Sequence, residues 1–478
     1  MAVPATAHWE VRTDGDNDNG GAFNFTRSGV GVDYPSTNNV FVYSGNLVQP
    51  GTDKNKLQVL SGRQFEADDI GNVINLTGGT GIIPGRYEIT AVSGGIATLD
   101  SNCWSTNSGG SGGSGRLGGA VAHPSIAARA TYQSGARSIF IWMRAGDYLW
   151  TPAQVINESV NISGMHFEGY ETNRGDRRGF ATWKATTGVL SILDSTHSFT
   201  AFNIIFDANN VSDVWGPLVS YATFYNCRFL NFRGGVRNEG LYNAVCCVRC
   251  MASGCTYYGF DTVKTVGCIA SNCSNTGFLG GVHSNSIAVN CQYGFYAESG
   301  QLDAINCVAY SCASSGFSSI TGNTTLVNCT SYNSGGDGFE ISEVLDGVTI
   351  VNCVAEGSGN YGFFFQRIYQ GERTIVHRIR GFNNTSGLHN MTNSYVLSET
   401  LRAVKSDDVV DLASSPFMDP EGGDFRLKRT EPVYSECRAI LQSPPNITAD
   451  WEPRAFNVGP MRQFDLGDPG GVIVIEED

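Results

Sequence analysis

The chain has 478 residues, which is long enough for two or three domains with a sizeable core and excludes a small disulfide-stapled scaffold. Acidic residues outnumber basic ones by 45 to 31, giving a formal net charge of −14, and this argues against a protein that binds nucleic-acid phosphates or an anionic membrane surface. Only 16% of residues are charged, while 41% are hydrophobic and 59 are glycine, which indicates a turn-rich, all-β chain.

The N-terminal stretch from Met1 to Val11 has no basic region followed by an apolar one, and nowhere do about 18 apolar residues run together. We therefore expect neither a signal peptide nor a membrane span, and a chain made in the cytosol. Under cytosolic redox conditions its 14 cysteines are expected to stay reduced rather than to form a disulfide framework.

Residues 1–104 contain β-like runs, at 73–76 and 87–92, separated by glycine-containing turns, and they predict a small N-terminal β domain that serves for attachment. Within it, Asp14, Asp16 and Asp18 alternate as the oxygen ligands of a calcium loop do, but Phe25 stands where a bidentate glutamate is needed. A polar turn built on Asx side chains is the favoured interpretation and calcium the alternative. No other cofactor is predicted.

The next segment, residues 105–119, is rich in glycine and serine and reads as a flexible linker. Residues 124–134 are then expected to form a short helix that caps the region after it, because the open end of a repeat structure must be covered.

From about residue 120 to about residue 400 the chain repeats itself. Five cysteines each stand nine residues before a glycine that is followed by phenylalanine, at intervals of 18, 39, 22 and 24 residues, and the long interval holds a shortened unit at Asn290-Cys291 with Gly294-Phe295. The cysteines are Cys250, Cys268, Cys307, Cys329 and Cys353, and the phenylalanines are Phe260, Phe278, Phe317, Phe339 and Phe363. A repeat of this period indicates a stacked, solenoid-like fold.

A unit of about 22 residues made of short strands and turns cannot bury its apolar side alone, so successive units must stack as a parallel β-helix of about twelve coils. Cysteines and phenylalanines at fixed offsets would then pile up in the interior. A second cysteine ladder is formed by Cys255, Cys273 and Cys312, and asparagines that precede cysteine are expected to form an amide ladder, at Asn226, Asn290, Asn306, Asn328 and Asn352. After residue 400 the repeat ends, and residues 401–478 are expected to form a C-terminal cap and an extended tail.

The densest group of charged side chains on the predicted solenoid comprises Asp337, Glu340, Glu343 and Asp346, with Arg367 one coil further on. Paired carboxylates near a basic residue are what glycan cleavage requires. The group is therefore the candidate catalytic site, with a solvated face as the alternative.

Four tyrosines in the repeats, Tyr257, Tyr293, Tyr296 and Tyr361, offer flat rings on which a sugar could stack. Rings stacked in the core explain the same residues, and both interpretations stay open at this point.

The segment from Ile139 to Tyr148, the Asn-Cys coils and the segment Gly423 to Leu427 resemble the pectin lyase-like right-handed parallel β-helix superfamily. The N-terminal stretch is similar to the heads of such proteins in bacteriophage and environmental sequences. The resemblance implies an all-β, right-handed parallel β-helix and a homotrimer. It does not imply one activity, because the superfamily contains lyases, hydrolases, phage tailspikes and structural members.

The expected function is that of a bacteriophage virion surface protein, either a capsid decoration protein or a tailspike. In this interpretation the N-terminal domain binds capsid or tail components and the solenoid projects and contacts host glycans. The alternatives are a polysaccharide lyase or glycoside hydrolase, and a carbohydrate-binding protein without turnover. No nucleic acid and no membrane is expected as a partner.

Overall fold

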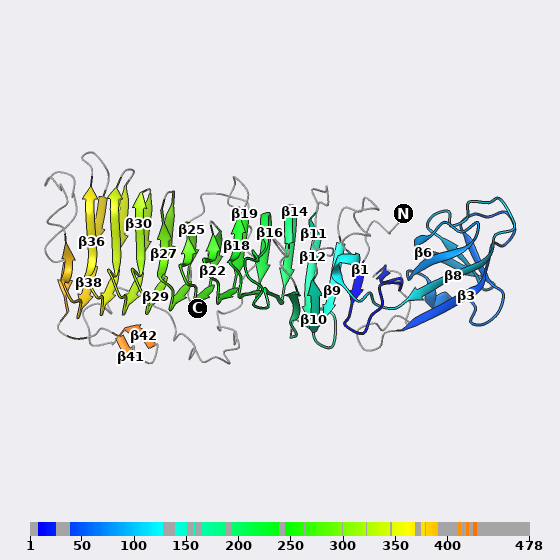
Figure 1. The fold of residues 1–478 in the computed structure, drawn as a ribbon, viewed down its shortest axis with the longest axis horizontal. Coiled ribbons are helices and arrows are strands. Elements are labelled where there is room, and N and C mark those ends of the chain that lie inside the picture. Colours follow the sequence, from blue (N-terminus) through cyan, green and yellow to red (C-terminus); the bar gives the residue numbers. More distant parts are fainter. Residues whose placement is uncertain are drawn as a thin grey trace, which may run out of the picture.

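The computed structural model describes residues 8–24, 39–127, 139–150, 156–157, 165–176, 178–186, 193–238, 244–261, 263–298, 300–321, 323–344, 347–368, 374–377, 379–390, 409–412, 414, 417–419 and 424–427. Figure 1 shows a small β unit at one end of a long stack of short parallel strands. The described part is almost entirely strand and turn, as predicted, with one 3₁₀ turn, η1 (Ala67–Asp69), and a helical stretch at residues 124–127.

The small unit is a closed antiparallel barrel of six strands in the order β3-β4-β7-β6-β5-β8. Its strands are β3 (Val40–Val48), β4 (Lys56–Val59), β5 (Val73–Thr80), β6 (Gly85–Ser93), β7 (Ile96–Leu99) and β8 (Ser111–Gly118). The prediction of a flexible linker at 105–119 is wrong for β8, which pairs with both β3 and β5. Glycines are required in this strand because a β-carbon at Gly113 or Gly115 would clash with Leu47 or with the β5 backbone.

The N-terminal strands belong to the solenoid and not to the barrel, which differs from the predicted 1–104 domain. Strand β1 (His8–Val11) pairs in parallel with β9 (Ile139–Arg144) and antiparallel with β2 (Ala22–Phe23). The chain then leaves for the barrel and returns at Val121, which forms a parallel bridge with Val11. The barrel is thus inserted into the first coil of the solenoid and fastened to it by two chain crossings.

Each solenoid coil contributes up to three short strands, and equivalent strands pair in parallel into three columns. The first column contains β18 (Gly234–Asn238), β21 (Tyr258–Asp261), β24 (Thr276–Leu279), β27 (Tyr293–Ala297), β30 (Phe317–Thr321), β33 (Phe339–Val344), β36 (Tyr361–Ile368) and β39 (Gly387–Asn390). The second column contains β1, β9, β12 (Met165–Tyr170), β14 (Leu193–Phe202), β16 (Leu218–Tyr225), β19 (Ala244–Val248), β22 (Lys264–Val266), β25 (Gly281–Ser284), β28 (Leu302–Ile305), β31 (Thr324–Val327), β34 (Val348–Val351) and β37 (Thr374–His377). The long strands β14 and β16 run through both columns, and the short β11 (Ile156–Asn157) pairs with β14.

The third column is a sheet of twelve strands, which agrees with the prediction of about twelve coils. It contains β10 (Gly146–Trp150), β13 (Ala181–Ala185), β15 (Ile204–Asp207), β17 (Arg228–Leu230), β20 (Met251–Ser253), β23 (Ile269–Ser271), β26 (Ile287–Val289), β29 (Val308–Tyr310), β32 (Thr330–Tyr332), β35 (Val354–Glu356), β38 (Ile379–Phe382) and β40 (Val409–Asp411). The parallel β-helix predicted from the repeat is therefore the fold of this chain.

The predicted phenylalanine ladder lies in the interior behind the first column. Its rings stack from coil to coil at centroid distances of 4.6 to 5.1 Å and interplanar angles of 3° to 9°. The ladder runs through Phe260, Phe278, Phe295, Phe317, Phe339 and Phe363, all of which are buried. Strand register enforces this, since each of these phenylalanines is the direct partner of the next.

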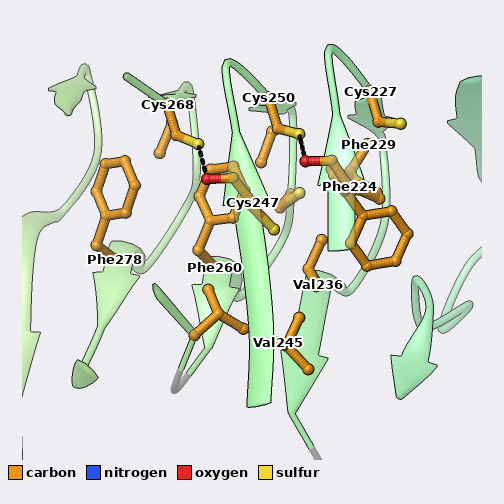
Figure 2. Close-up of a cluster of buried hydrophobic side chains, with 14 of the residues drawn as sticks. Phe224, Cys227, Phe229, Val236, Val245, Cys247, Cys250, Phe260, Cys268 and Phe278 are labelled. Atoms are coloured by element: carbon orange, nitrogen blue, oxygen red, sulfur yellow. Dashed lines mark hydrogen bonds between the residues drawn. The ribbon is translucent and has the colours of Figure 1, made fainter. Parts of the chain in front are cut away.

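Ten cysteines form two ladders at the two turns that flank the third column, whereas Cys103 lies in the barrel and Cys246 and Cys247 in β19. All thirteen cysteines in the described part are free thiols. Figure 2 shows Cys227, Cys250 and Cys268 at equivalent places in successive coils, beside the phenylalanine rings. The shortened unit is assigned differently from the prediction. The Ile287 N–H donates to the Cys268 carbonyl, and the Val308 N–H donates to the Ser286 carbonyl. Ser286 therefore occupies the first-ladder position of its coil, and Cys291 belongs to the second ladder.

Residues that precede the ladder positions adopt the left-handed conformation that closes each turn. In the turn before the third column, which we call the first turn row, φ lies between 51° and 54° at Asn226, Asn306, Asn328 and Asn352. Asparagine is the non-glycine residue that tolerates this left-handed region best. Side-chain amides of neighbouring coils bond at 3.1 Å from Asn328 to Asn306. The predicted amide ladder is present, although Asn290 stands in the second turn row with Asn272, to which it donates at 3.4 Å.

Two polar side chains, Thr265 and His283, lie next to each other in the interior of the second column. His283 is fully buried between Thr265 and Ala304 of the neighbouring coils. Its Nδ1 accepts a bond from the Thr265 hydroxyl at 2.9 Å, and its Nε2 donates to the Gly280 carbonyl at 2.7 Å. Burial lowers the pKa of His283 to about 4, so the ring is neutral in the folded protein.

The two ends of the solenoid lie only partly within the described residues. Residues 124–127 are helical, as the predicted cap requires, and 128–134 lie outside the described part. At the other end β40 extends the third column, and β41 (Phe417–Asp419) and β42 (Asp424–Leu427) form an antiparallel pair. The expected tail beyond residue 427 lies outside the described residues.

Candidate functional site

The outer face of the first column collects most of the side chains that the sequence singled out. Register aligns Asp261, Leu279, Tyr296, Ser318, Glu340 and Phe364 in one row. Backbone bonds align Tyr293, Ser315, Asp337 and Tyr361 in a second row, which Tyr258 and Thr276 continue. We call these two rows the aromatic–acidic face. They face outward because the ladder phenylalanine between them fills the interior.

The tyrosines lie on this face in pairs and not in the core. Tyr293 stacks on Tyr296 with ring centroids 4.9 Å apart, and Tyr257 meets Tyr258 edge-on at 4.4 Å. Tyr361 stacks on Phe364 at 6.0 Å. Tyr257 is 40% exposed, so its ring is open to a ligand. Phe364 was not predicted as a site residue; its position eleven residues after a ladder cysteine is the signal that identifies it.

Two of the predicted carboxylates, Asp337 and Glu340, lie between the tyrosine pairs. The Asp337 carboxylate accepts the Tyr361 backbone N–H at 2.9 Å, and one Glu340 oxygen accepts hydroxyl bonds from Ser315 at 2.8 Å and Ser318 at 3.1 Å. These serines were missed because serine is frequent in every turn of the repeat. The hydrogen bonds hold both carboxylates in fixed positions.

The two carboxylates occupy different environments. Burial raises the pKa of Asp337 above its ordinary value, and the negative charge of Glu340 raises it further, while the bond from the Tyr361 N–H opposes both effects. A carboxyl group that holds its proton more tightly, next to a second carboxylate, is the arrangement that general acid–base chemistry uses.

The other predicted members of the charged group are placed only in part. Glu343 in β33 and Arg367 in β36 are direct register partners on neighbouring strands. Their side chains, and the whole of Asp346, lie outside the described residues. Their participation in a site stays a prediction.

The calcium candidate loop is occupied by arginine contacts. Arg12 donates to Asp14 at 2.8 Å, Arg116 bonds Asp16, and the Asp18 backbone N–H donates to Asp16 at 3.0 Å. Arg86 also donates to the Asn17 carbonyl at 2.7 Å. These bonds link the barrel to the solenoid through the loop, and calcium binding by Asp14, Asp16 and Asp18 stays the alternative that the sequence left open.

Over the described ranges, no three histidine, cysteine, aspartate or glutamate side chains come together as a metal site would require. Within the same ranges no helix has the length and apolar character needed to cross a bilayer.

Comparisons with known proteins give distant likenesses in structure only. No family model matches the sequence, and no curated protein matches it. Among solved structures, the catalytic domain of a GH87 α-1,3-glucanase in complex with tetrasaccharides is 12% identical, with 80% of this chain and 91% of that chain covered and a TM-score of 0.32. The tailspike protein gp49 from Pseudomonas phage LKA1 is 11% identical, with coverages of 76% and 63% and a TM-score of 0.16. The assignment of the fold to the parallel β-helices rests on the strand register of this chain.

Proposed function

We propose that this protein is a bacteriophage virion surface protein, of the capsid decoration or tailspike type, whose solenoid projects outward and binds glycans of the host surface on the aromatic–acidic face. The observation that carries glycan binding is the pairing of aromatic rings on a rigid outer face, at Tyr293 with Tyr296 and at Tyr361 with Phe364. Flat rings supported by a sheet offer a sugar an apolar surface, and neighbouring carboxylates accept bonds from its hydroxyl groups.

The test uses a glycan array with the full chain and a matched pair of variants. Tyr293→Ala with Tyr296→Ala is expected to lower glycan binding at least tenfold. The control is Tyr310→Ala with Tyr332→Ala, since these rings also stack, at 5.6 Å, but on the third column. Equal losses in both double variants, or no glycan bound by the parent, would contradict the proposal.

Glycan cleavage is the second candidate, and the Asp337 and Glu340 environments favour it. Asp337→Asn and Glu340→Gln would each abolish release of reducing ends or unsaturated uronides from a polysaccharide panel but keep most of the glycan binding, because the amide oxygen still accepts a hydroxyl bond. Asp303→Asn is the matched control, because burial raises the pKa of Asp303 too but its strand, β28, lies in the second column. A parent chain that binds glycan and releases no product makes the protein a binder without turnover.

The barrel is proposed to attach the solenoid to capsid or tail components. Its position supports this, because two chain crossings fix it to the first coil and leave the opposite end of the solenoid distant (Figure 1). Val42 and Leu60, 62% and 67% exposed, offer apolar contacts on its surface. Val42→Asp with Leu60→Asp should prevent incorporation into particles that lack this chain and leave glycan binding unchanged; normal incorporation would contradict the assignment.

Self-association as a homotrimer is proposed through the outer face of the second column. Tyr221, Val266 and Ile305 on this face are 38% to 45% exposed, and apolar side chains at such exposure are suited to contact between copies. Val266→Asp with Ile305→Asp should convert a sedimenting trimer into monomers. Leu149→Asp, on the third column and 54% exposed, is the control and should leave the trimer intact.

A further inference from the structure

Among the described residues, no cation balances the charge of the two carboxylates on the aromatic–acidic face. Asp337 and Glu340 belong to the same coil, and neither forms an ion pair with the part of the chain that the structure describes. The bonds that they accept come from neutral donors, which are the Tyr361 backbone N–H for Asp337 and the hydroxyls of Ser315 and Ser318 for Glu340. These bonds fix the position of both groups and leave their negative charge unbalanced.

Each carboxylate also has an oxygen that is left open. Asp337 is only 9% exposed, and its second oxygen receives no hydrogen bond from a described residue. The same is true of Glu340, because both serine hydroxyls donate to one of its two oxygens. A largely buried carboxylate with an open oxygen is stabilised by a donor from outside the chain, and an ammonium group is the donor that also balances the charge.

Pairs of aromatic rings flank the carboxylates along the solenoid. Tyr293 and Tyr296 stand at β27, two strands before the coil of Glu340. Tyr361 and Phe364 stand at β36, one strand after it. At about 4.8 Å between neighbouring strands, the two ring pairs are about 14 Å apart with the carboxylates between them. A ligand of a few sugar rings therefore reaches both ring pairs and passes over the carboxylates.

These rings are not covered by a cation, in contrast to rings elsewhere in the protein. The guanidinium of Arg63 lies 3.8 Å from the centroid of the Phe41 ring, and that of Arg174 lies 4.1 Å from the centroid of Phe23. Within the described ranges, no such contact is made with the four rings beside the carboxylates. The face of an aromatic ring attracts a cation, so these four rings are available to one that a ligand brings.

The arginines of the first column stand at other register positions. Arg367 is the partner of Glu343 and comes three residues after Phe364, which is about 10 Å further along the strand. Arg237 is the partner of Asp261, at the opposite end of the face. The two rows therefore hold no arginine or lysine between β27 and β36.

We propose that the aromatic–acidic face recognises a glycan with free amino groups, and that the ammonium of one amino sugar binds at Asp337 and Glu340 while its neighbours stack on the ring pairs. The inference rests on the proposed glycan binding and adds the chemical class of the glycan. An ammonium donates to the open carboxylate oxygens and is attracted by the ring faces. A uronic acid would instead bring a like charge to a chain whose net charge is already −14.

The test compares oligosaccharides of hexosamines in matched pairs, one with free amines and one with the same amines acetylated. The full chain is screened on an array of such pairs, and the affinities of the tightest pair are measured by calorimetry. We expect the free-amine form to bind about tenfold more tightly, from one ion pair and one cation–π contact. Addition of salt should reduce this preference because it screens the charges.

The matched variants separate charge from the rest of the surface. The Asp337→Asn, Glu340→Gln double variant should bind both forms as the parent binds the acetylated one, which also shows that the variant folds. The Asp207→Asn, Asp303→Asn double variant removes the same charge from the third and second columns and should keep the preference.

Equal binding of the two forms by the parent would overturn the inference and leave the proposed glycan binding in place, and so would a preference that persists in the Asp337→Asn, Glu340→Gln variant. A lysine-rich peptide that binds as tightly as the free-amine glycan would assign the face to a protein partner, which also overturns it. The proposed function itself fails if no oligosaccharide binds, or if Tyr293→Ala with Tyr296→Ala weakens neither form.

Discussion

The first coils and the middle coils of the solenoid have the same architecture but fill their interiors in different ways. In the middle coils the first-column ladder is phenylalanine six times in succession, with rings nearly parallel. In the first coils the register-equivalent interior residues of the second column are Trp9, Ile141, Phe167, Ala201 and Phe224. A coil stack therefore does not need identical side chains in every column, and the second column stays mixed in the middle coils, where Cys247, Thr265, His283 and Ala304 follow one another.

Ring geometry makes the same distinction. Trp183 of the third column meets Phe167 of the second column at 80° and Phe206 of the next third-column strand at 78°, so rings in the first coils pack edge to face. Interlocked packing depends on specific partners, whereas a parallel stack repeats one contact. The two regions should accordingly differ in how they respond to substitution.

The largest effect is expected for Trp183→Ala. Trp183 is fully buried and its indole N–H lies 3.1 Å from the Met143 sulfur, so its removal leaves a large cavity among unlike neighbours. A loss of about 4 to 5 kcal/mol in the free energy of unfolding is expected, against about 3 kcal/mol for Phe317→Ala, where two ladder rings can close in. Urea unfolding measures both, and a larger loss for Phe317→Ala would reverse the comparison.

The next largest effect is a pH dependence to which His283 in the middle coils contributes, beside His8 in the first coil, whose pKa burial also lowers to about 4. His283 has a pKa of about 4 in the folded protein, and the ordinary value of 6.5 applies when it is unfolded. The unfolded chain thus binds more protons between these values, and stability falls as the pH is lowered from 6.5 to 4. The two pKa values differ by about 2.5, which corresponds to a loss of about 3 kcal/mol in the free energy of unfolding.

The control for this pH effect is His283→Leu, which keeps an apolar side chain in the Thr265 to Ala304 column but cannot be protonated. Its unfolding midpoint should change less between pH 6.5 and 4 than that of the parent. Parallel pH profiles for the two proteins would show that His283 is not the source.

A smaller effect is expected in the turn rows. Asn328 has φ of 53° and donates to Asn306, so Asn328→Ala places a β-carbon in the left-handed region and removes an amide bond. A loss of about 1 to 2 kcal/mol is expected. Asn328→Gly keeps the backbone conformation and should lose less, and a greater loss for glycine would show that the backbone conformation is not the cause.

The comparison also explains which parts of the fold the sequence predicts. The middle coils were predicted in detail because one residue type, such as Phe260 and its equivalents, recurs at one offset. The first coils have no such signature, and β1 could not be assigned to the solenoid because its partner, β9, lies about 130 residues away. The sequence of β8 predicts a linker because its glycines and serines show no alternation of apolar and polar residues. Its strand pairing depends on β3 and β5 of the barrel, which lie far away in the sequence.

Part of the aromatic–acidic face was singled out from the sequence, but not as one surface. Tyr293, Tyr296, Asp337 and Glu340 were all identified from sequence, and strand register brings them together. The assignment of Cys291 to the first ladder failed because the third column between the two turns is only three residues long, so both turn rows carry the same Asn-Cys pair.

The smallest effect is expected for a cysteine-to-serine change in the first ladder, because one coil already has serine at this position. Ser286 holds a first-ladder place that cysteine holds in the coils on either side, and its hydroxyl donates to the Ser284 carbonyl at 3.0 Å. The Cys307 thiol makes the equivalent bond, to the Ile305 carbonyl two residues before it, at 3.4 Å. A serine hydroxyl at position 307 would find the same acceptor in place.

Cys307→Ser is therefore expected to lower the free energy of unfolding by less than about 1 kcal/mol, because the polar group that it buries has a hydrogen-bond partner. Cys307→Val keeps the apolar character but adds volume and offers no donor to that carbonyl, so it should lose more. Comparing the free energies of unfolding of the two variants in urea shows whether hydrogen bonding or apolar burial contributes more to the stability of the cysteine ladder. If Cys307→Val is the more stable variant, apolar burial of the thiol holds the ladder together and Ser286 is a tolerated defect.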